Sequence, residues 1–254
     1  MKRSIKSLTG YGMRETDGDI GKVVDFYFDD ISWTIRYLIV KTGNWLSERK
    51  VLISPQSLQQ PDWENKEFPV NLTQEQIKNS PDIDTDKPVS RQHEEQLHTY
   101  YPWEEYWGNE SAHGAGIFGQ MPSELYYSDV SQPAEISNPG QQGNNDEHLH
   151  STESIEGYKI HAIDGEIGKV VDYIVDDVTW KLKFFVVETG SWLGSKKILL
   201  STQWIREVNW ENSTVIVNIS TDAVKNSPEF DPSQPVNEAD EHQLFDYYGR
   251  PHED

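Results

Sequence analysis

The chain has 254 residues, a hydrophobic fraction of only 35% and a formal net charge of −21. This composition favours two small cores over one large core, and the charge opposes binding to nucleic acid or to anionic membranes. The absence of cysteine excludes disulfides, thiolate metal sites and cysteine nucleophiles, and it is compatible with a cytoplasmic protein.

The first part of the chain predicts a series of short strands. Strands are expected over residues 11–15, 20–28, 33–41, 49–54 and 67–72, because apolar and β-branched residues there alternate or cluster between turn residues. The turns are predicted at Asp17-Gly18, at Asp29-Asp30 and around Gly43. Such a run of short strands is typical of a small closed or half-closed β-barrel.

Two short helices are predicted after the strands. Thr73, followed by Gln76 three residues later, predicts a capped helical turn that ends near Pro81. Ser90 is the expected cap of a second helix that reaches Tyr101. We expect this tail to pack its leucine and tyrosine on the barrel.

The same pattern occurs twice in one register. Adding 147 to a residue number in the first copy gives its counterpart, with about 40 identities in 95 aligned positions between residues 7–101 and 154–248. Asp17 to Asp25 and Asp164 to Asp172 illustrate the match. A period of this length predicts a duplicated domain, since solenoid repeats run to roughly 20–50 residues.

The predicted organisation is therefore a barrel with a helical tail over residues 1–107, a linker over 108–147 and a second barrel with tail over 148–254. The linker has no Lys or Arg and is rich in Gly, Ser, Asn and Gln, so we expect it to be disordered. Docking of its few apolar residues, such as Leu125 to Tyr127, on a barrel stays open.

Together these motifs resemble the PRC-barrel family. The resemblance rests on Gly-Tyr, then Asp-Gly-x-Ile-Gly-Lys-Val-x-Asp, an apolar strand and Lys50 to Ser54, all repeated in the second copy up to Lys197 to Ser201. The family is named for the cytoplasmic domain of the photosynthetic reaction-centre H subunit and includes the C-terminal domain of a ribosome maturation factor. The resemblance implies β-barrels used for protein–protein contact or assembly, with no catalytic residues. Unlike the H subunit, this chain has no segment that predicts a transmembrane helix.

Acidic and histidine residues supply the candidate polar sites. Two clusters of carboxylates could hold a divalent cation, but carboxylates at strand ends more often bond to their own turns, so no metal or cofactor is expected. The clusters are Asp25, Asp29 and Asp30, and Asp172, Asp176 and Asp177. His148 and His150 are interpreted as incidental surface residues, and Glu94-Glu95 as a solvated face.

Tryptophans supply the candidate partner-binding residues. Trp45 and Trp192 follow Gly-containing turns, where an exposed ring anchors interfaces, although core packing is the simpler interpretation. Trp103 and Trp107 belong to the tail of the first copy only, and they either dock on a barrel or bind a partner.

We predict a non-catalytic adaptor for unidentified protein partners. The two barrels either bridge partners through the linker or pair as an internal pseudo-dimer, and homo-oligomers stay open. The alternative is an accessory factor in reaction-centre-type electron transport or complex assembly, by family analogy alone. An enzyme is not expected, because it requires a convergent polar pocket in one barrel that the other lacks.

Overall fold

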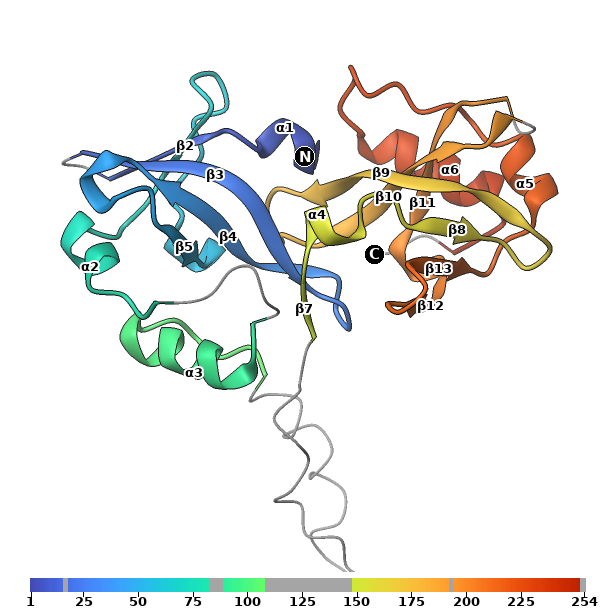
Figure 1. Ribbon diagram of the computed structural model, residues 1–254. Helices are drawn as coiled ribbons and strands as arrows, with labels where there is room; N and C mark the ends of the chain where they lie inside the picture. The colour runs from blue at the N-terminus through green and yellow to red at the C-terminus, as the bar shows by residue number, and fades with distance from the viewer. Residues whose placement is uncertain (16–17, 83–88, 108–147, 192–193, 252–254) are drawn as a thin grey trace, which may run out of the picture.

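The computed structural model describes residues 1–15, 18–82, 89–107, 148–191 and 194–251. Residues 1–107, without their gaps, are called the first half below, and residues 148–251 the second half. Figure 1 shows the two halves side by side, each built on a curved sheet with helices at its margins. The predicted mainly β fold is confirmed. The predicted linker, 108–147, lies outside the described residues, and the predicted domain boundaries stay a prediction.

The sheet of the first half has the strand order β5-β4-β3-β2-β6. All neighbours are antiparallel except β2 and β6, which are parallel. Its strands are β2 (Gly12–Glu15), β3 (Gly18–Asp29), β4 (Thr34–Thr42), β5 (Lys50–Ile53) and β6 (Glu67–Pro69). The helical elements are α1 (Ile5–Leu8), η1 (Asn44–Leu46), η2 (Pro55–Ser57), α2 (Gln74–Lys78) and α3 (Arg91–Tyr100).

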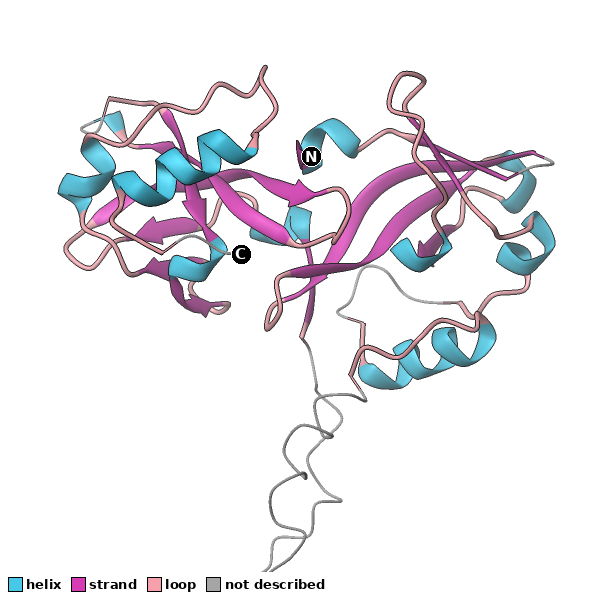
Figure 2. Ribbon diagram, turned by 180° about the vertical axis from the view of Figure 1, so that it is seen from behind, coloured by secondary structure: helices cyan, strands magenta, loops and turns pink. Residues whose placement is uncertain are grey.

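The second half repeats this plan with the order β11-β10-β9-β8-β13-β12. Its strands are β8 (Lys159–His161), β9 (Glu166–Asp176), β10 (Leu182–Thr189), β11 (Lys197–Ser201), β12 (Ile205–Asn209) and β13 (Thr214–Val217). The helical elements are α4 (Thr152–Ile155), η5 (Thr202–Trp204), α5 (Thr221–Lys225) and α6 (Glu238–Tyr247). Figure 2 shows α6 across the outer face of this half.

Each half donates one strand to the sheet of the other half. Strand β1 (Lys2–Ser4) pairs antiparallel with β9, and β7 (Leu149–Ser151) pairs antiparallel with β3. The two pairings are equivalent under the repeat, because Lys2 lies opposite Asp176 as Leu149 lies opposite Asp29. This reciprocal geometry is that of a two-fold dimer. Of the two predicted arrangements, the structure has the internal pseudo-dimer.

Hydrogen bonds to two carboxylates anchor the exchanged segments. Asp25 accepts from the hydroxyls of Ser151 and Thr152, which begin α4. In the mirrored position Asp172 accepts from Ser4 Oγ at 2.5 Å and from the Lys6 backbone N at 3.1 Å, at the start of α1. These bonds satisfy hydroxyl and backbone N–H donors at the start of each helix, and they connect the two halves.

The two hairpin turns that precede β4 and β10 also cross. The Ile35 backbone N–H donates to the Trp180 carbonyl at 2.8 Å, and the Leu182 N–H donates to the Trp33 carbonyl. Trp33 and Trp180 both adopt positive φ, +55° and +59°. Trp33 meets Phe185 of the other half edge to face at 5.3 Å, so each turn inserts a large ring into the interface.

Local sequence explains most helix ends. The Thr73–Gln76 capping box is present as predicted, and Asn237 forms a second one with Asp240. Ser90 occupies the predicted N-cap position, but its side chain makes no capping bond, so that part of the prediction is wrong. Leu97, like its counterpart Leu244, is buried, which confirms that the tails pack on the sheets.

Two equivalent glycines allow β3 and β9 to lie close to the next strand. A Cβ on Gly21 would lie 2.2 Å from the Lys41 carbonyl oxygen, and one on Gly168 would lie 2.0 Å from that of Glu188. Only glycine fits at such a distance. Within the described residues, no helix has both the length and the apolar character needed to cross a membrane.

Candidate functional site

The tryptophans predicted to bind partners have different surroundings. Trp45 is half-buried against the core, and its indole N–H donates to the Ile20 carbonyl at 2.9 Å. This bond holds η1 over the start of β3. Trp192 lies outside the described residues. A role of either ring in binding stays a prediction.

Trp103 lies in the core of the first half, 8% exposed. Its indole N–H donates to Ser57 Oγ at 2.7 Å, and its ring stacks on Tyr101 at 4.4 Å. In the second half Trp204 occupies the position equivalent to Ser57, and its ring lies 4.6 Å from Tyr248, the counterpart of Tyr101. The tail therefore supplies in one copy the ring that η5 supplies in the other.

Trp107 is half-buried at the end of the first tail. The Arg91 guanidinium carbon lies 4.5 Å from its ring centroid, and the His98 ring lies 4.6 Å away. A cation over an indole face is stabilising, so these contacts hold the tail on α3. A role of Trp107 in partner binding stays a prediction.

The carboxylates proposed as cation ligands instead bind protein groups. Asp29 accepts from the Ile31 and Ser32 backbone N–H groups at 2.9 and 3.1 Å, and Asp176 accepts from the equivalent turn. Partial burial tends to raise the pKa of Asp176, but the hydrogen bonds that Asp176 accepts from the Thr179 and Val178 backbone N–H groups outweigh it, so the pKa is lowered. Within the described residues, no group of three or more His, Asp or Glu side chains is placed to hold a metal ion.

The remaining two acids contact the exchanged strands. Asp30 lies 3.2 Å from His150 Nε2, and Asp177 lies 2.7 Å from Arg3 Nε. His150 also stacks on Trp210 at 3.5 Å. In the repeat, the counterparts of these two residues are Arg3 and Trp63, and Arg3 likewise lies over the Trp63 ring. His150 is thus part of the interface, and its interpretation as an incidental surface residue is wrong.

The sequence did not predict a buried polar cluster in the first half, centred on Glu94. The Glu94 side chain is 0% exposed, so its interpretation as part of a solvated face is wrong. Its carboxylate accepts from Tyr37 at 3.0 Å, Tyr106 at 2.5 Å and Arg91 at 2.9 Å. His148 Nε2 lies 3.1 Å away, and His148 itself is buried, so it too is not a surface residue. The three donors, with His148 beside them, satisfy a carboxylate that burial alone would destabilise.

His98 extends this cluster. Its Nε2 lies 2.9 Å from the Tyr37 hydroxyl, which itself donates to Glu94, so we assign the Nε2–H tautomer. Burial lowers the pKa of His98, which keeps the ring neutral near neutral pH. Burial, followed by the negative charge of Glu94, raises the pKa of Tyr37 and of Tyr106. The cluster (Tyr37, Arg91, Glu94, His98, Tyr106 and His148) is called the buried polar cluster below.

Pairwise comparison of the two copies was the one pattern that could have revealed this cluster. Tyr37 aligns with Phe184 and His98 with Phe245, so two neighbouring positions change from polar to apolar together. The cluster is a convergent set of polar side chains that only the first half has, which is the feature that an enzyme would require. The Tyr37 and Tyr106 hydroxyls both donate to its one acid, Glu94, and among the described residues no Ser hydroxyl is hydrogen-bonded to His98.

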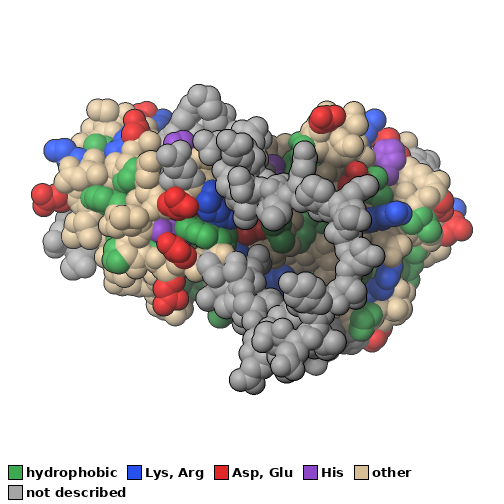
Figure 3. Space-filling model, turned by 90° about the horizontal axis from the view of Figure 1, so that it is seen from below, with side chains coloured by type: hydrophobic (Ala, Val, Ile, Leu, Met, Phe, Trp, Pro, Cys, Tyr) green, Lys and Arg blue, Asp and Glu red, His purple; other side chains and the backbone are tan. Residues whose placement is uncertain are grey.

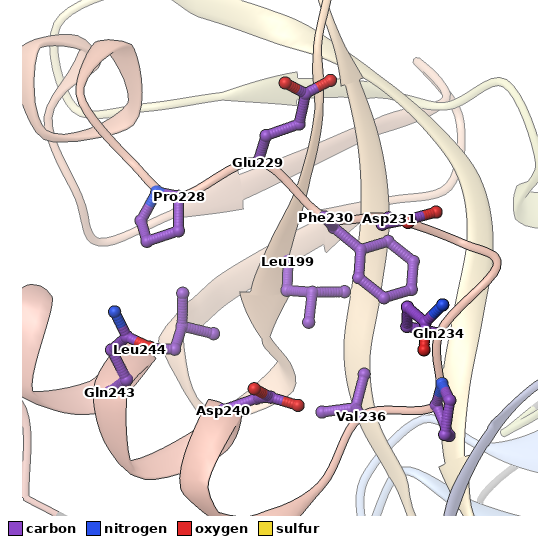
Figure 4. A pocket seen from close by; sticks show the side chains of 11 residues that line it. Leu199, Pro228, Glu229, Phe230, Asp231, Gln234, Val236, Asp240, Gln243 and Leu244 are labelled. Atoms are coloured by element: carbon purple, nitrogen blue, oxygen red, sulfur yellow. The ribbon is translucent and has the colours of Figure 1, made fainter.

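A separate groove lies on the second half between α6 and residues 228–236, with a volume of about 240 Å³. Figure 4 shows Leu199, Phe230, Val236 and Leu244 facing a common space. The lining residues include three acids and no Lys or Arg; the acids are Glu229, Asp231 and Asp240. The groove is therefore lined by apolar side chains together with three acids, and we call it the acidic groove.

The sequence was compared with known families and proteins. The family model of the PRC-barrel domain matches residues 7–77 and 147–224, more than half of the chain. No curated protein matches the chain.

Proposed function

The chain belongs to the PRC-barrel family, whose domains serve as modules for protein–protein contact and scaffolding, and on this premise we propose that it is a non-catalytic scaffold protein. In this proposal the paired halves act as one unit that presents the acidic groove to a partner. The observation that carries it is a groove lined by apolar side chains and three acids, with no Lys or Arg in its lining.

The proposed occupant is an extended segment of another protein, with an apolar side chain flanked by Lys or Arg. Charge complementarity favours Lys or Arg on either side of the apolar residue, because the only charged residues that line the groove are acids. The adjoining surface already binds one such segment: Lys2 of β1 forms a bridge with Val236, and its ammonium pairs with Glu241 of α6. A partner segment would extend the same mode of recognition into the groove.

The scaffold differs from a bivalent adaptor on a flexible tether. The exchanged strands and crossed turns fix the halves against each other, so the affinity gain expected from two independent modules does not apply. The reaction-centre accessory role rests on family resemblance alone and stays a prediction, as does the cytoplasmic location.

Selection from a random peptide library displayed on phage tests the proposal with the full chain. We expect enriched peptides to carry an apolar residue beside Lys or Arg, and to lose binding to the Glu229→Lys/Asp231→Lys variant. Both side chains are exposed, so the reversal should leave the fold intact. Glu75→Lys, an exposed reversal on α2 of the first half, is the matched control. Enrichment without basic residues, or binding that survives the double reversal, would overturn the proposal.

A further inference from the structure

A cleft lies between the two halves, on the side of the buried polar cluster. Its volume is about 410 Å³, within the size range of small-molecule sites, and such sites often occur where domains meet. Its walls come from β4, η2 and the first tail on one side and from the turn before β10 on the other, including Arg36, Tyr106 and Trp180. Figure 3 shows hydrophobic, basic, acidic and histidine side chains on this face of the molecule. We call it the interface cleft.

The second half shows that the fold does not need the buried polar cluster. Where the first half has Tyr37 and His98, the second has Phe184 and Phe245, buried and in edge-to-face contact at 6.4 Å. Apolar packing of this kind is usually as stable as a buried ionic network, or more so. Stability therefore does not account for the cluster, whose members His98 and Tyr106 line the cleft.

Arg36 supplies a positioned cation in the cleft wall. One terminal nitrogen, Nη2, lies 3.3 Å from Asp29 Oδ2 and 3.0 Å from Ser32 Oγ. The guanidinium carbon lies 3.6 Å from the centroid of the Tyr106 ring. Among the described residues, the other terminal nitrogen has no hydrogen-bond partner and is not buried. A guanidinium held flat in this way is suited to a carboxylate.

Three acids close to the cleft are each paired with a guanidinium, although the chain as a whole is strongly acidic. The pairs are Asp29 with Arg36, Asp177 with Arg3, and Glu94 with Arg91. These pairs reduce the repulsion that the three carboxylates would exert on an anion. The cleft wall also has an apolar part, formed by Leu58 and Trp180 among others.

We propose that the interface cleft binds a small organic carboxylate, with its carboxylate on the terminal nitrogen of Arg36 and its apolar body on the Leu58 and Trp180 side. The Tyr106 ring holds the Arg36 guanidinium in place, and the Tyr106 hydroxyl is itself held by its hydrogen bond to Glu94. The buried polar cluster is then the support of the binding site, which explains why only the first half has it. This site is separate from the acidic groove.

Titration of the full chain with benzoate, followed by ¹H–¹⁵N NMR and tryptophan fluorescence, tests the proposal. Benzamide is the uncharged control probe, and acetate controls for ionic strength and for the contribution of the apolar body. We expect saturable benzoate binding that shifts the Trp180 indole resonance, with benzamide weaker by roughly tenfold or more.

Variants locate the site. Arg36→Gln should weaken benzoate binding roughly tenfold or more, and Lys183→Gln, at the equivalent position of the second half, should leave it unchanged. Arg36→Lys keeps the charge without the planar fork and should give an intermediate loss, which covers the case in which the glutamine variant fails to fold. No saturable binding to the wild type, equal binding of benzamide, or equal losses in the Arg36 and Lys183 variants would overturn the proposal.

Discussion

Replacing Asp25 by alanine tests whether the exchanged segments hold the two halves together. The Asp25 side chain is 9% exposed and accepts hydrogen bonds from the other half at Ser151 Oγ, at Thr152 Oγ1 (2.6 Å) and at the Glu153 backbone N–H (3.3 Å). The substitution removes the acceptor for all three of these donors, so the Ser151 and Thr152 hydroxyl hydrogens lose their acceptor inside the interface.

The magnitude follows from the number of charge-assisted bonds. Each hydrogen bond to a charged group contributes about 1.5–3 kcal/mol, so loss of the two hydroxyl bonds should cost about 3–6 kcal/mol. The longer backbone bond to Glu153 is left out of this sum. In a chain cut between the halves, the same loss corresponds to roughly 10²–10⁴-fold weaker association. Asp172→Ala should have a similar but smaller effect, because Asp172 is more exposed.

Two assays measure this effect. Urea unfolding of the intact chain gives the change in the free energy of unfolding, and a site-specific protease site placed within 108–147 gives the affinity between the cut halves. Asp82→Ala is the control, since its side chain is 90% exposed and its pair with Arg49 should contribute about 1 kcal/mol or less. If Asp25→Ala costs no more than Asp82→Ala, or the cut halves separate equally in wild type and variant, the reasoning fails.

Three further predictions concern pH and packing. Burial lowers the pKa of His98 below its unfolded value near 6.5. The free energy of unfolding should therefore be unaffected by this histidine above pH 6.5 and should fall below that pH by up to about 1.4 kcal/mol per pH unit. Urea unfolding at pH 7.5 and 5.5 should show a smaller loss of stability in His98→Phe than in wild type. Tyr37 and Tyr106 have raised pKa values, so stability should fall as pH rises above about 10, and absorbance at 295 nm should show both phenols ionising only as the protein unfolds. Gly21→Ala should lower the melting temperature strongly, since its Cβ would overlap a carbonyl oxygen, whereas Gly12→Ala, with no atom within about 3.8 Å, should change it little; equal effects would contradict the close-approach argument.

Much of each half could be predicted from local sequence. The alternation and turn residues gave the main strands, and Asp29 forms the turn expected of an acid at a strand end. The capping box at Thr73 was also predictable, because it depends on two residues three positions apart. These features are decided by short-range interactions.

The strand exchange could not be predicted in the same way. Strand β1 is only three residues long, and its partner β9 has nearly the same sequence as β3. The local pattern therefore does not specify which of two almost identical sheets the strand joins. The exchange is seen only in the tertiary contacts across the halves, such as Asp172 with Ser4.

The position of Trp103 could not be predicted from the sequence for a related reason. Its site in the core depends on the small side chain of Ser57, 46 positions earlier, where the second copy has Trp204. The burial of Glu94 likewise depends on Tyr37 and His148, which are remote in sequence. A charged residue on a short helix predicts exposure unless these distant partners are known.

The pseudo-two-fold arrangement explains how one half could acquire a feature that the other lacks. In a homodimer with this geometry, every substitution occurs twice, so a buried carboxylate such as Glu94 would have to be satisfied in both halves. In one continuous chain the copies vary independently. The equivalent of Glu94, Glu241, is paired with Lys2 of the exchanged strand, whereas Glu94 itself contacts His148, the residue that precedes the other exchanged strand. Both glutamates thus lie beside the exchange, and only Glu94 is hydrogen-bonded to phenols, one of which lines the interface cleft. A duplicated chain can in this way retain the symmetric contacts that hold it together and still build an asymmetric binding site on one side.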